Sequence, residues 1–138
     1  MNVDFEIMEI PKGEQKKYPI AYVEGILKVF VGNVLFFNQS GILLIELAIS
    51  IRKWLVNMNG DNNLNFIYVS MDNDSPILTI NYAHDNYYRI HSIWQEINIL
   101  EFLLKEDIIA GFEKYLEDLE EALKLKAGIE LSIFFQDI

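Results

Sequence analysis

The sequence predicts an α+β protein, with a mostly antiparallel sheet of about six or seven strands and two helices packed on it. Several short segments alternate apolar and polar residues with a period of two, which is typical of half-buried strands. Two longer segments, at about 41–58 and 106–127, instead repeat apolar residues at helical spacing. Because no repeat, low-complexity tract or linker interrupts this order, we expect a single domain over residues 1–138.

Residues 2–39 are predicted to form mostly strands. Residues 2–10 alternate between apolar and acidic side chains, which predicts a strand exposed on one side. Residues 11–19 have a proline at each end and predict a polar loop. Residues 20–39 are rich in branched and aromatic side chains and contain Gly32 and Asn33 between two apolar runs. This pattern predicts two antiparallel strands joined by a tight turn.

The first helix is expected over about 41–58. Ser40 is placed to cap its start, and Gly60 is a good terminator. Glu46 lies toward the start of the helix, where the helix dipole favours a negative charge. The apolar positions that recur at three- and four-residue spacing are Leu44, Leu47, Ala48, Ile51 and Leu55.

Further strands are predicted between the two helices. After a turn at 60–63, the candidates are "LNFIYVSM", "PILTINYAH" and "YYRIHSIWQEI", separated by "DNDSP" and by Asp85-Asn86. "NILEFLL" is a possible fourth strand. The second helix follows over 106–127 and ends at Gly128. The weak alternation in 129–138 leaves open whether these residues add a closing strand.

The amino-acid composition restricts the kinds of partner and compartment that we expect. The 138-residue chain has 21 acids against 11 bases and a formal charge of −10, which repels nucleic-acid backbones and anionic lipids. With no cysteine, it has no disulfide and no thiolate metal site. The amino terminus carries acids where a signal peptide would carry bases, and the apolar run 41–51 is too short to span a bilayer. We therefore expect a cytoplasmic protein that binds neither nucleic acid nor membrane directly.

The stretch "HDNYYRIHSIW" at 84–94 gathers histidine, tyrosine and arginine. A two-residue turn at Asp85-Asn86 would pair His84 with Tyr87, Tyr82 with Arg89, Ile80 with His91, and Leu78 with Ile93. His84 and His91 would then lie about 13 Å apart, too far to share a metal ion. In this register Tyr82 would stack under Arg89. The stretch is either an ordinary sheet face or a contact surface formed by Tyr82, His84, Tyr87 and Arg89.

The segment "EKYLEDLEEALK" at 113–124 concentrates negative charge. Its acids are Glu113, Glu117, Asp118, Glu120 and Glu121. They are either the solvated face of the second helix, with Glu113 and Glu117 repelling and Glu120 attracting Lys124, or a surface for a basic partner. Between Glu96 and Glu121 there are nine acids and two lysines, an excess of seven that favours the basic partner.

No catalytic, cofactor or metal residue is predicted. The chain lacks a glycine-rich phosphate loop and an HExxH motif, and the aspartates at 61, 72 and 74 lack the glycine and distal glutamate of an EF-hand. A catalytic serine–histidine–acid triad could be drawn from Ser70, His84 and Asp85, but any chain of this size contains such residue sets. We expect that the protein is not an enzyme.

In size, cysteine-free composition and the order of its elements, the chain resembles the small acidic immunity proteins of bacterial polymorphic-toxin and contact-dependent inhibition systems. The segments that carry this resemblance are the early strands leading through "NQSGILLIELAISI" to a helix, and the closing acidic helix "EDIIAGFEKYLEDLEEALKLKAG". The resemblance implies a cytoplasmic inhibitor that binds a cognate toxin domain, often a basic nuclease, and blocks its active site. It assigns no role to any single residue.

Two alternatives remain open: a generic or self-associating protein-interaction domain, and a small enzyme. The sequence leaves the oligomeric state and the partner's activity undetermined. A neighbouring gene for a large secreted protein with a basic carboxy-terminal domain would distinguish the inhibitor from both alternatives.

Overall fold

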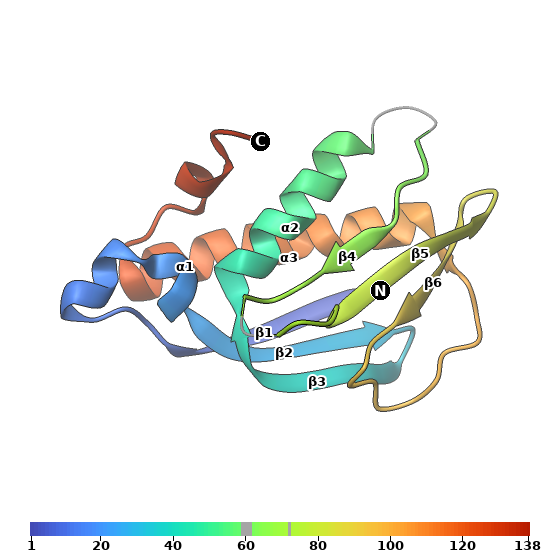
Figure 1. Ribbon diagram of the computed structural model, residues 1–138, viewed down its shortest axis with the longest axis horizontal. Helices are drawn as coiled ribbons and strands as arrows, with labels where there is room; N and C mark the ends of the chain where they lie inside the picture. The colour runs from blue at the N-terminus through green and yellow to red at the C-terminus, as the bar shows by residue number, and fades with distance from the viewer. Residues whose placement is uncertain (59–61, 72) are drawn as a thin grey trace.

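The strands form two antiparallel sheets (Figure 1). The structure is a computed structural model that describes residues 1–58, 62–71 and 73–138. The first sheet has the order β1-β2-β3, with β1 (Asn2–Glu9), β2 (Glu24–Val31) and β3 (Val34–Leu43). The second has the order β4-β5-β6-β7, with β4 (Phe66–Tyr68), β5 (Leu78–His84), β6 (Tyr87–His91) and β7 (Leu103–Leu104). The α+β class is confirmed, and the described residues form seven strands that are divided between two sheets.

Both long helices are present, as α2 (Leu44–Asn57) and α3 (Lys105–Ala127). The predicted loop at 11–19 is more regular than expected, because it contains the 3-10 helix η1 (Gly13–Lys17) and leads into the short helix α1 (Pro19–Tyr22). The last residues form the 3-10 helix η2 (Leu131–Phe135), not a closing strand. No helix in the described part of the chain has both the length and the apolar character needed to cross a bilayer.

The first helix begins later than predicted, and Ser40 does not cap it. Ser40 lies in β3, and α2 begins at Leu44 without a side-chain cap. The amide of Leu44 donates instead to the carbonyl of Val23, at 3.1 Å, so the turn before β2 satisfies a donor at the helix start. The predicted terminator Gly60 and the next residue of the predicted turn at 60–63 lie outside the described residues.

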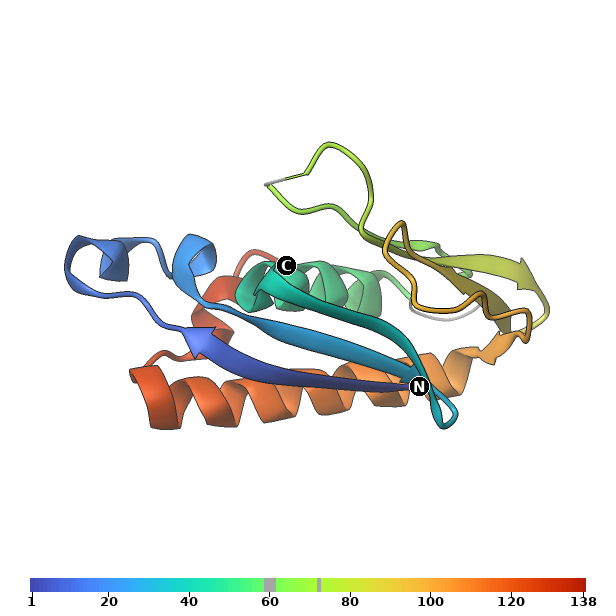
Figure 2. The ribbon, with the colours of Figure 1, turned by 90° about the horizontal axis from the view of Figure 1, so that it is seen from below.

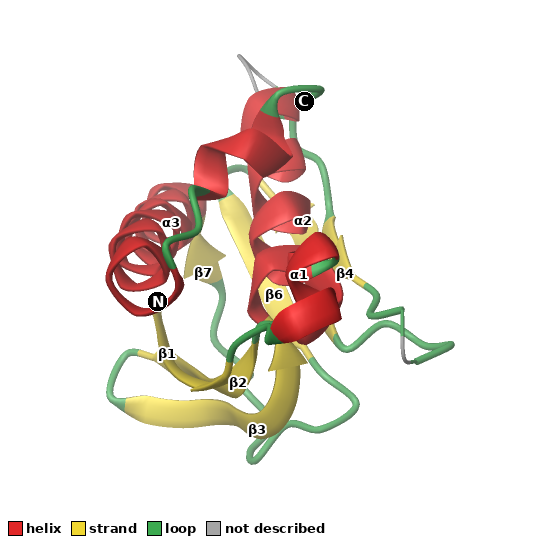
Figure 3. Ribbon diagram, turned by 90° about the vertical axis from the view of Figure 1, so that its left-hand side faces the viewer, coloured by secondary structure: helices red, strands yellow, loops and turns green. Residues whose placement is uncertain are grey.

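The helices and sheets enclose one hydrophobic core. Seen along α3, the helices α3 and α2 lie side by side above the first sheet, with β4 on the far side of α2 (Figure 3). From below, α3 runs along the strands of the first sheet (Figure 2). The indole of Trp54 on α2 joins the layers, because its ring makes edge contacts with Phe66, Tyr88 and Phe112 at 5.7–6.3 Å between centroids.

Candidate protein-binding surfaces

The five acids predicted on the second helix all lie on α3, but they divide into two groups. Asp118 accepts a 2.6 Å hydrogen bond from Lys114, and Glu120 pairs with Lys124 at 3.6 Å, each four residues away on the helix. The hydrogen bond to Asp118, and then its negative charge, raise the pKa of Lys114. The predicted attraction between Glu120 and Lys124 is confirmed. These two acids are therefore largely neutralised within the helix.

The other group is an acidic stripe, which we define as Glu113, Glu117 and Glu121. All three side chains are exposed, and their spacing of four residues places them in one row along α3. No ion pair among the described residues involves any of the three. Each carboxylate is separated from the next by a rise of about 6 Å along the helix. The stripe thus presents to solvent three negative charges that make no ion pair with a described residue.

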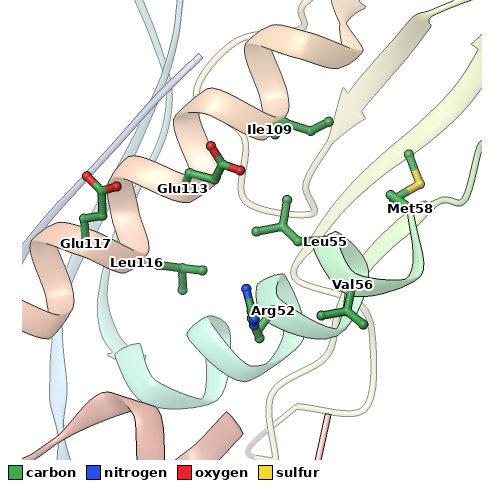
Figure 4. A pocket seen from close by; sticks show the side chains of 8 residues that line it. All are labelled: Arg52, Leu55, Val56, Met58, Ile109, Glu113, Leu116 and Glu117. Atoms are coloured by element: carbon green, nitrogen blue, oxygen red, sulfur yellow. The ribbon is translucent and has the colours of Figure 1, made fainter. Parts of the chain in front are cut away.

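A groove lies beside the acidic stripe, between α2 and α3 (Figure 4). Its volume is about 540 Å³. Its lining is mostly apolar, with two carboxylates of the stripe and one cation: Arg52, Leu55, Val56, Met58, Ile109, Glu113, Leu116 and Glu117. Sequence reasoning had predicted the acids but not the groove, because the groove depends on how the two helices pack.

The β5–β6 hairpin differs from its predicted register. The two-residue turn and the pair His84–Tyr87 are confirmed, and Asp85 adopts a positive φ of 52° in the turn. A bulge between Tyr82 and His84 then shifts every later pair by one residue, so that Tyr82 faces Tyr88 and Arg89 faces Asn81. The predicted pairs of Tyr82 with Arg89, Ile80 with His91 and Leu78 with Ile93 are therefore wrong.

The bulge also changes the partner of Arg89. The guanidinium of Arg89 lies 4.5 Å from the ring centroid of Phe102, not over Tyr82. The Phe102 ring also contacts His84, at 5.1 Å, and Tyr87, at 6.0 Å. The Tyr82 ring packs edge-on against the buried Tyr88. Three of the four predicted contact residues thus meet around Phe102, which sequence reasoning missed, while Tyr82 lies on the other side of the sheet.

Exposed apolar side chains extend this cluster across the second sheet. Ile67 on β4 pairs with Thr79, and Leu104 on β7 pairs with Tyr87. The outward-facing set, called the aromatic face below, comprises Ile67, His84, Tyr87, Arg89, Phe102 and Leu104. Tyrosine and arginine on such a face are typical of protein–protein contacts.

The hairpin does not bring the two histidines together. His91 pairs with Thr79, five residues before His84 on β5, which separates the two rings by about 16 Å along the strand. Within the described ranges, no group of three or more histidine or acidic side chains is arranged to hold a metal ion.

The triad considered from the sequence is not assembled. His84 Nδ1 does lie 3.1 Å from Asp85 Oδ2, in an exposed pair. Ser70, however, follows β4, whose Tyr68 pairs with Leu78 at the opposite end of β5 from His84. Six residues of strand, or about 20 Å, separate these two ends.

The fold and these surfaces define an α+β protein with an acidic helical groove on one side and an aromatic sheet face on another. The chain belongs to the family described as a domain of unknown function, DUF7878, whose model matches residues 2–125. That range runs from the first residue of β1 nearly to the end of α3. No curated protein and no solved structure matches the chain.

Proposed function

We propose that this protein is a non-catalytic inhibitor of the immunity type, which binds a basic, nuclease-type toxin domain of bacterial origin in the cytoplasm. The observation that carries the proposal is the acidic stripe of Glu113, Glu117 and Glu121. Lysines on α3 pair with Asp118 and Glu120 but with none of these three. A basic toxin surface would supply the missing cations.

The charge of the chain supports the same proposal. A net charge of −10 attracts a basic domain within about one Debye length, which is about 8 Å at physiological salt, and so steers the encounter. Steering of this kind raises the association rate and makes it fall as salt rises. Speed of association is valuable in an inhibitor, because it must reach the toxin before the substrate does.

The test reverses the stripe. In the triple variant Glu113→Lys, Glu117→Lys, Glu121→Lys, we expect the fold to survive within about 0.5 kcal/mol per site, because all three side chains are exposed. We expect association with the toxin to slow by about tenfold or more at low salt and to lose most of its salt dependence. The measurement is a kinetic binding series at several salt concentrations, with the toxin taken from the gene neighbourhood described above.

The matched control reverses three exposed acids on β1 and η1, Glu6, Glu9 and Glu14, and so changes the net charge by the same amount. If both triple variants slow association equally, only net charge matters. If the stripe variant binds the toxin and protects cells as well as the wild type, the stripe is a solvated helix face and the proposal fails.

A second candidate function is a self-associating or adaptor domain that uses the aromatic face. The observation that favours it is the stacking of Arg89 on an exposed Phe102, on the same sheet face as the exposed Ile67 and Leu104. Ile67, for example, is 53% exposed on the edge strand β4. Large apolar side chains gathered on one sheet face mark interaction sites more often than apolar side chains scattered singly.

A further inference from the structure

The groove between α2 and α3 has apolar side chains on both walls that are partly exposed to solvent. Leu55 and Val56 from α2 and Ile109 and Leu116 from α3 line it and are each half-buried. Figure 4 shows Leu116 directed from α3 toward α2 and Leu55 directed from α2 toward α3, on opposite walls. Met58, directly after the last residue of α2, is buried and also lines the groove. The groove therefore offers apolar surface that a partner's side chains would remove from water.

The charges on the groove's two walls are unequal. Glu113 and Glu117 lie on the α3 wall. Glu121, four residues further along α3, continues their row beyond the groove. Arg52 lies on the α2 wall, where its guanidinium is 5.9 Å from the ring centroid of Phe135 in η2. No ion pair of the described residues joins Arg52 to either glutamate. The α3 wall thus attracts cations while the α2 wall carries one cation of its own.

We propose that this groove binds an amphipathic α-helix of the partner, with apolar side chains on its inner face and lysines or arginines on the flank that faces α3. The proposal rests on the proposed function and identifies the segment of the toxin that is held. Lysines at i, i+4 and i+8 repeat every 6 Å or so along a helix, which matches the spacing of the acidic stripe when the helices are nearly aligned.

The walls of the groove favour a helix over an extended segment. Both walls are α-helices, whose backbone groups are already hydrogen-bonded within each helix. An extended segment would find no strand edge here to pair its own amides and carbonyls. A helix satisfies its backbone internally and needs from the groove only contacts with side chains.

The position of Arg52 predicts the direction in which a substitution there changes the binding affinity, and this can be tested. If a basic helix binds in the groove, Arg52 opposes it, and Arg52→Glu should tighten binding by about twofold to tenfold. The double variant Glu113→Lys, Glu117→Lys should weaken binding by about tenfold or more, because each reversal replaces an attraction by a repulsion. The double variant Glu6→Lys, Glu9→Lys is the control, since it makes the same change of charge on β1.

The probe is a fluorescein-labelled peptide of about 18 residues, or roughly five turns, with a leucine stripe flanked by lysines. It is titrated with the intact protein and followed by fluorescence anisotropy at physiological salt. A peptide of the same composition with the leucine stripe scrambled separates groove binding from general attraction of cations. We expect the amphipathic peptide to bind at least about tenfold more tightly than the scrambled one, and Leu116→Ala to reduce that difference. Circular dichroism of each variant checks that it is folded.

Three outcomes would overturn the proposal. The first is equal binding of the two peptides, or no saturable binding of the amphipathic one up to about 1 mM. The second is weaker binding by Arg52→Glu. The third is a wild-type dimer that Leu116→Ala dissociates, because the occupant would then be a second copy of this chain.

The toxin experiment separates this proposal from the proposed function. If stripe reversal abolishes toxin inhibition while Leu116→Ala does not affect it, the protein is an inhibitor but the groove is not its helix-binding site. If the groove binds the peptide while no toxin is inhibited, the groove proposal stands and the inhibitor proposal fails.

Discussion

Tyr115 provides a quantitative test of how α3, and with it the acidic stripe, is held against α2. Its side chain is fully buried, its hydroxyl donates a 2.8 Å hydrogen bond to the carbonyl of Leu44, and its ring packs edge-on against Phe5. The carbonyl of the first helical residue also accepts the amide four residues later, so removing the hydroxyl leaves it with a partner. Tyr115→Phe should therefore cost only the net value of one hydrogen bond, about 0.5–1.5 kcal/mol at neutral pH.

The same substitution should have the opposite effect at alkaline pH. Burial, followed by the nearby hydroxyl of Tyr68, raises the pKa of Tyr115 well above its ordinary value of 10.0. Above pH 10 the unfolded chain loses the tyrosine proton while the folded chain retains it. The stability that this tyrosine contributes is fully present below its unfolded pKa and declines by about 1.4 kcal/mol per pH unit above it. Tyr115→Phe removes this decline, whereas Tyr88, whose pKa is also raised by burial, contributes equally to both proteins.

The two stability curves should therefore cross within about one unit above pH 10, since a deficit of about 1 kcal/mol is recovered at about 1.4 kcal/mol per unit. Urea denaturation followed by tryptophan fluorescence, at half-unit steps from about pH 7 to pH 11, measures both curves. A constant gap up to pH 11 would show that Tyr115 ionises as readily in the folded state as in the unfolded state. A neutral-pH loss above about 3 kcal/mol would instead show that the hydroxyl holds more than one contact.

Two further predictions concern the core and the aromatic face. Leu47→Ala and Ile51→Ala should each lower the free energy of unfolding, measured by urea denaturation, by about 2–5 kcal/mol, because both side chains are fully buried. Leu55→Ala should lower it by less, because Leu55 is half-buried. Equal losses at all three positions would mean that the groove beside Leu55 is closed in solution. If the aromatic face mediates self-association, sedimentation velocity at about 100 μM should show a wild-type dimer and a Phe102→Ser monomer, and a monomeric wild type would exclude that role.

Local patterns predicted the elements whose stabilising contacts are close in sequence. The period-two alternation of residues 2–10 corresponds to β1, and the turn at Gly32 was recognisable because glycine tolerates the φ of 59° found there. The start of α2 was not recognisable in this way. Residues 41–43 belong to an apolar run that fits a helix, but Ile42 and Leu43 pair with β2, at Gly25 and Glu24. Pairing between strands therefore outweighed the helical spacing, and the site of Ser40 became part of a strand.

The candidate surfaces were predictable to different degrees. The acids of α3 could be placed on one helix from the sequence, and even the pair Glu120–Lys124 follows from four-residue spacing. The aromatic face could not, because one bulged residue at Ala83 changes the register of the hairpin, and no local signal marks it. Phe102 could be connected with Arg89 only once β7 had been placed beside β6.

The distribution of lysines on α3 bears on whether the acidic stripe is a solvated helix face or, as we propose, a partner-binding surface. Lys114 and Lys124 lie four residues from Asp118 and Glu120 and pair with them, so this helix does use the spacing that relieves negative charge. The acidic stripe has the same four-residue spacing but contains only glutamates, whose neighbouring pairs repel by a few tenths of a kcal/mol each. A helix face that is only solvated gains no stability from a row of like charges beside an apolar groove. A partner that brings cations to the stripe and apolar side chains to the groove would relieve the repulsion and cover the apolar surface together, which is why we consider the stripe and the groove to be one site.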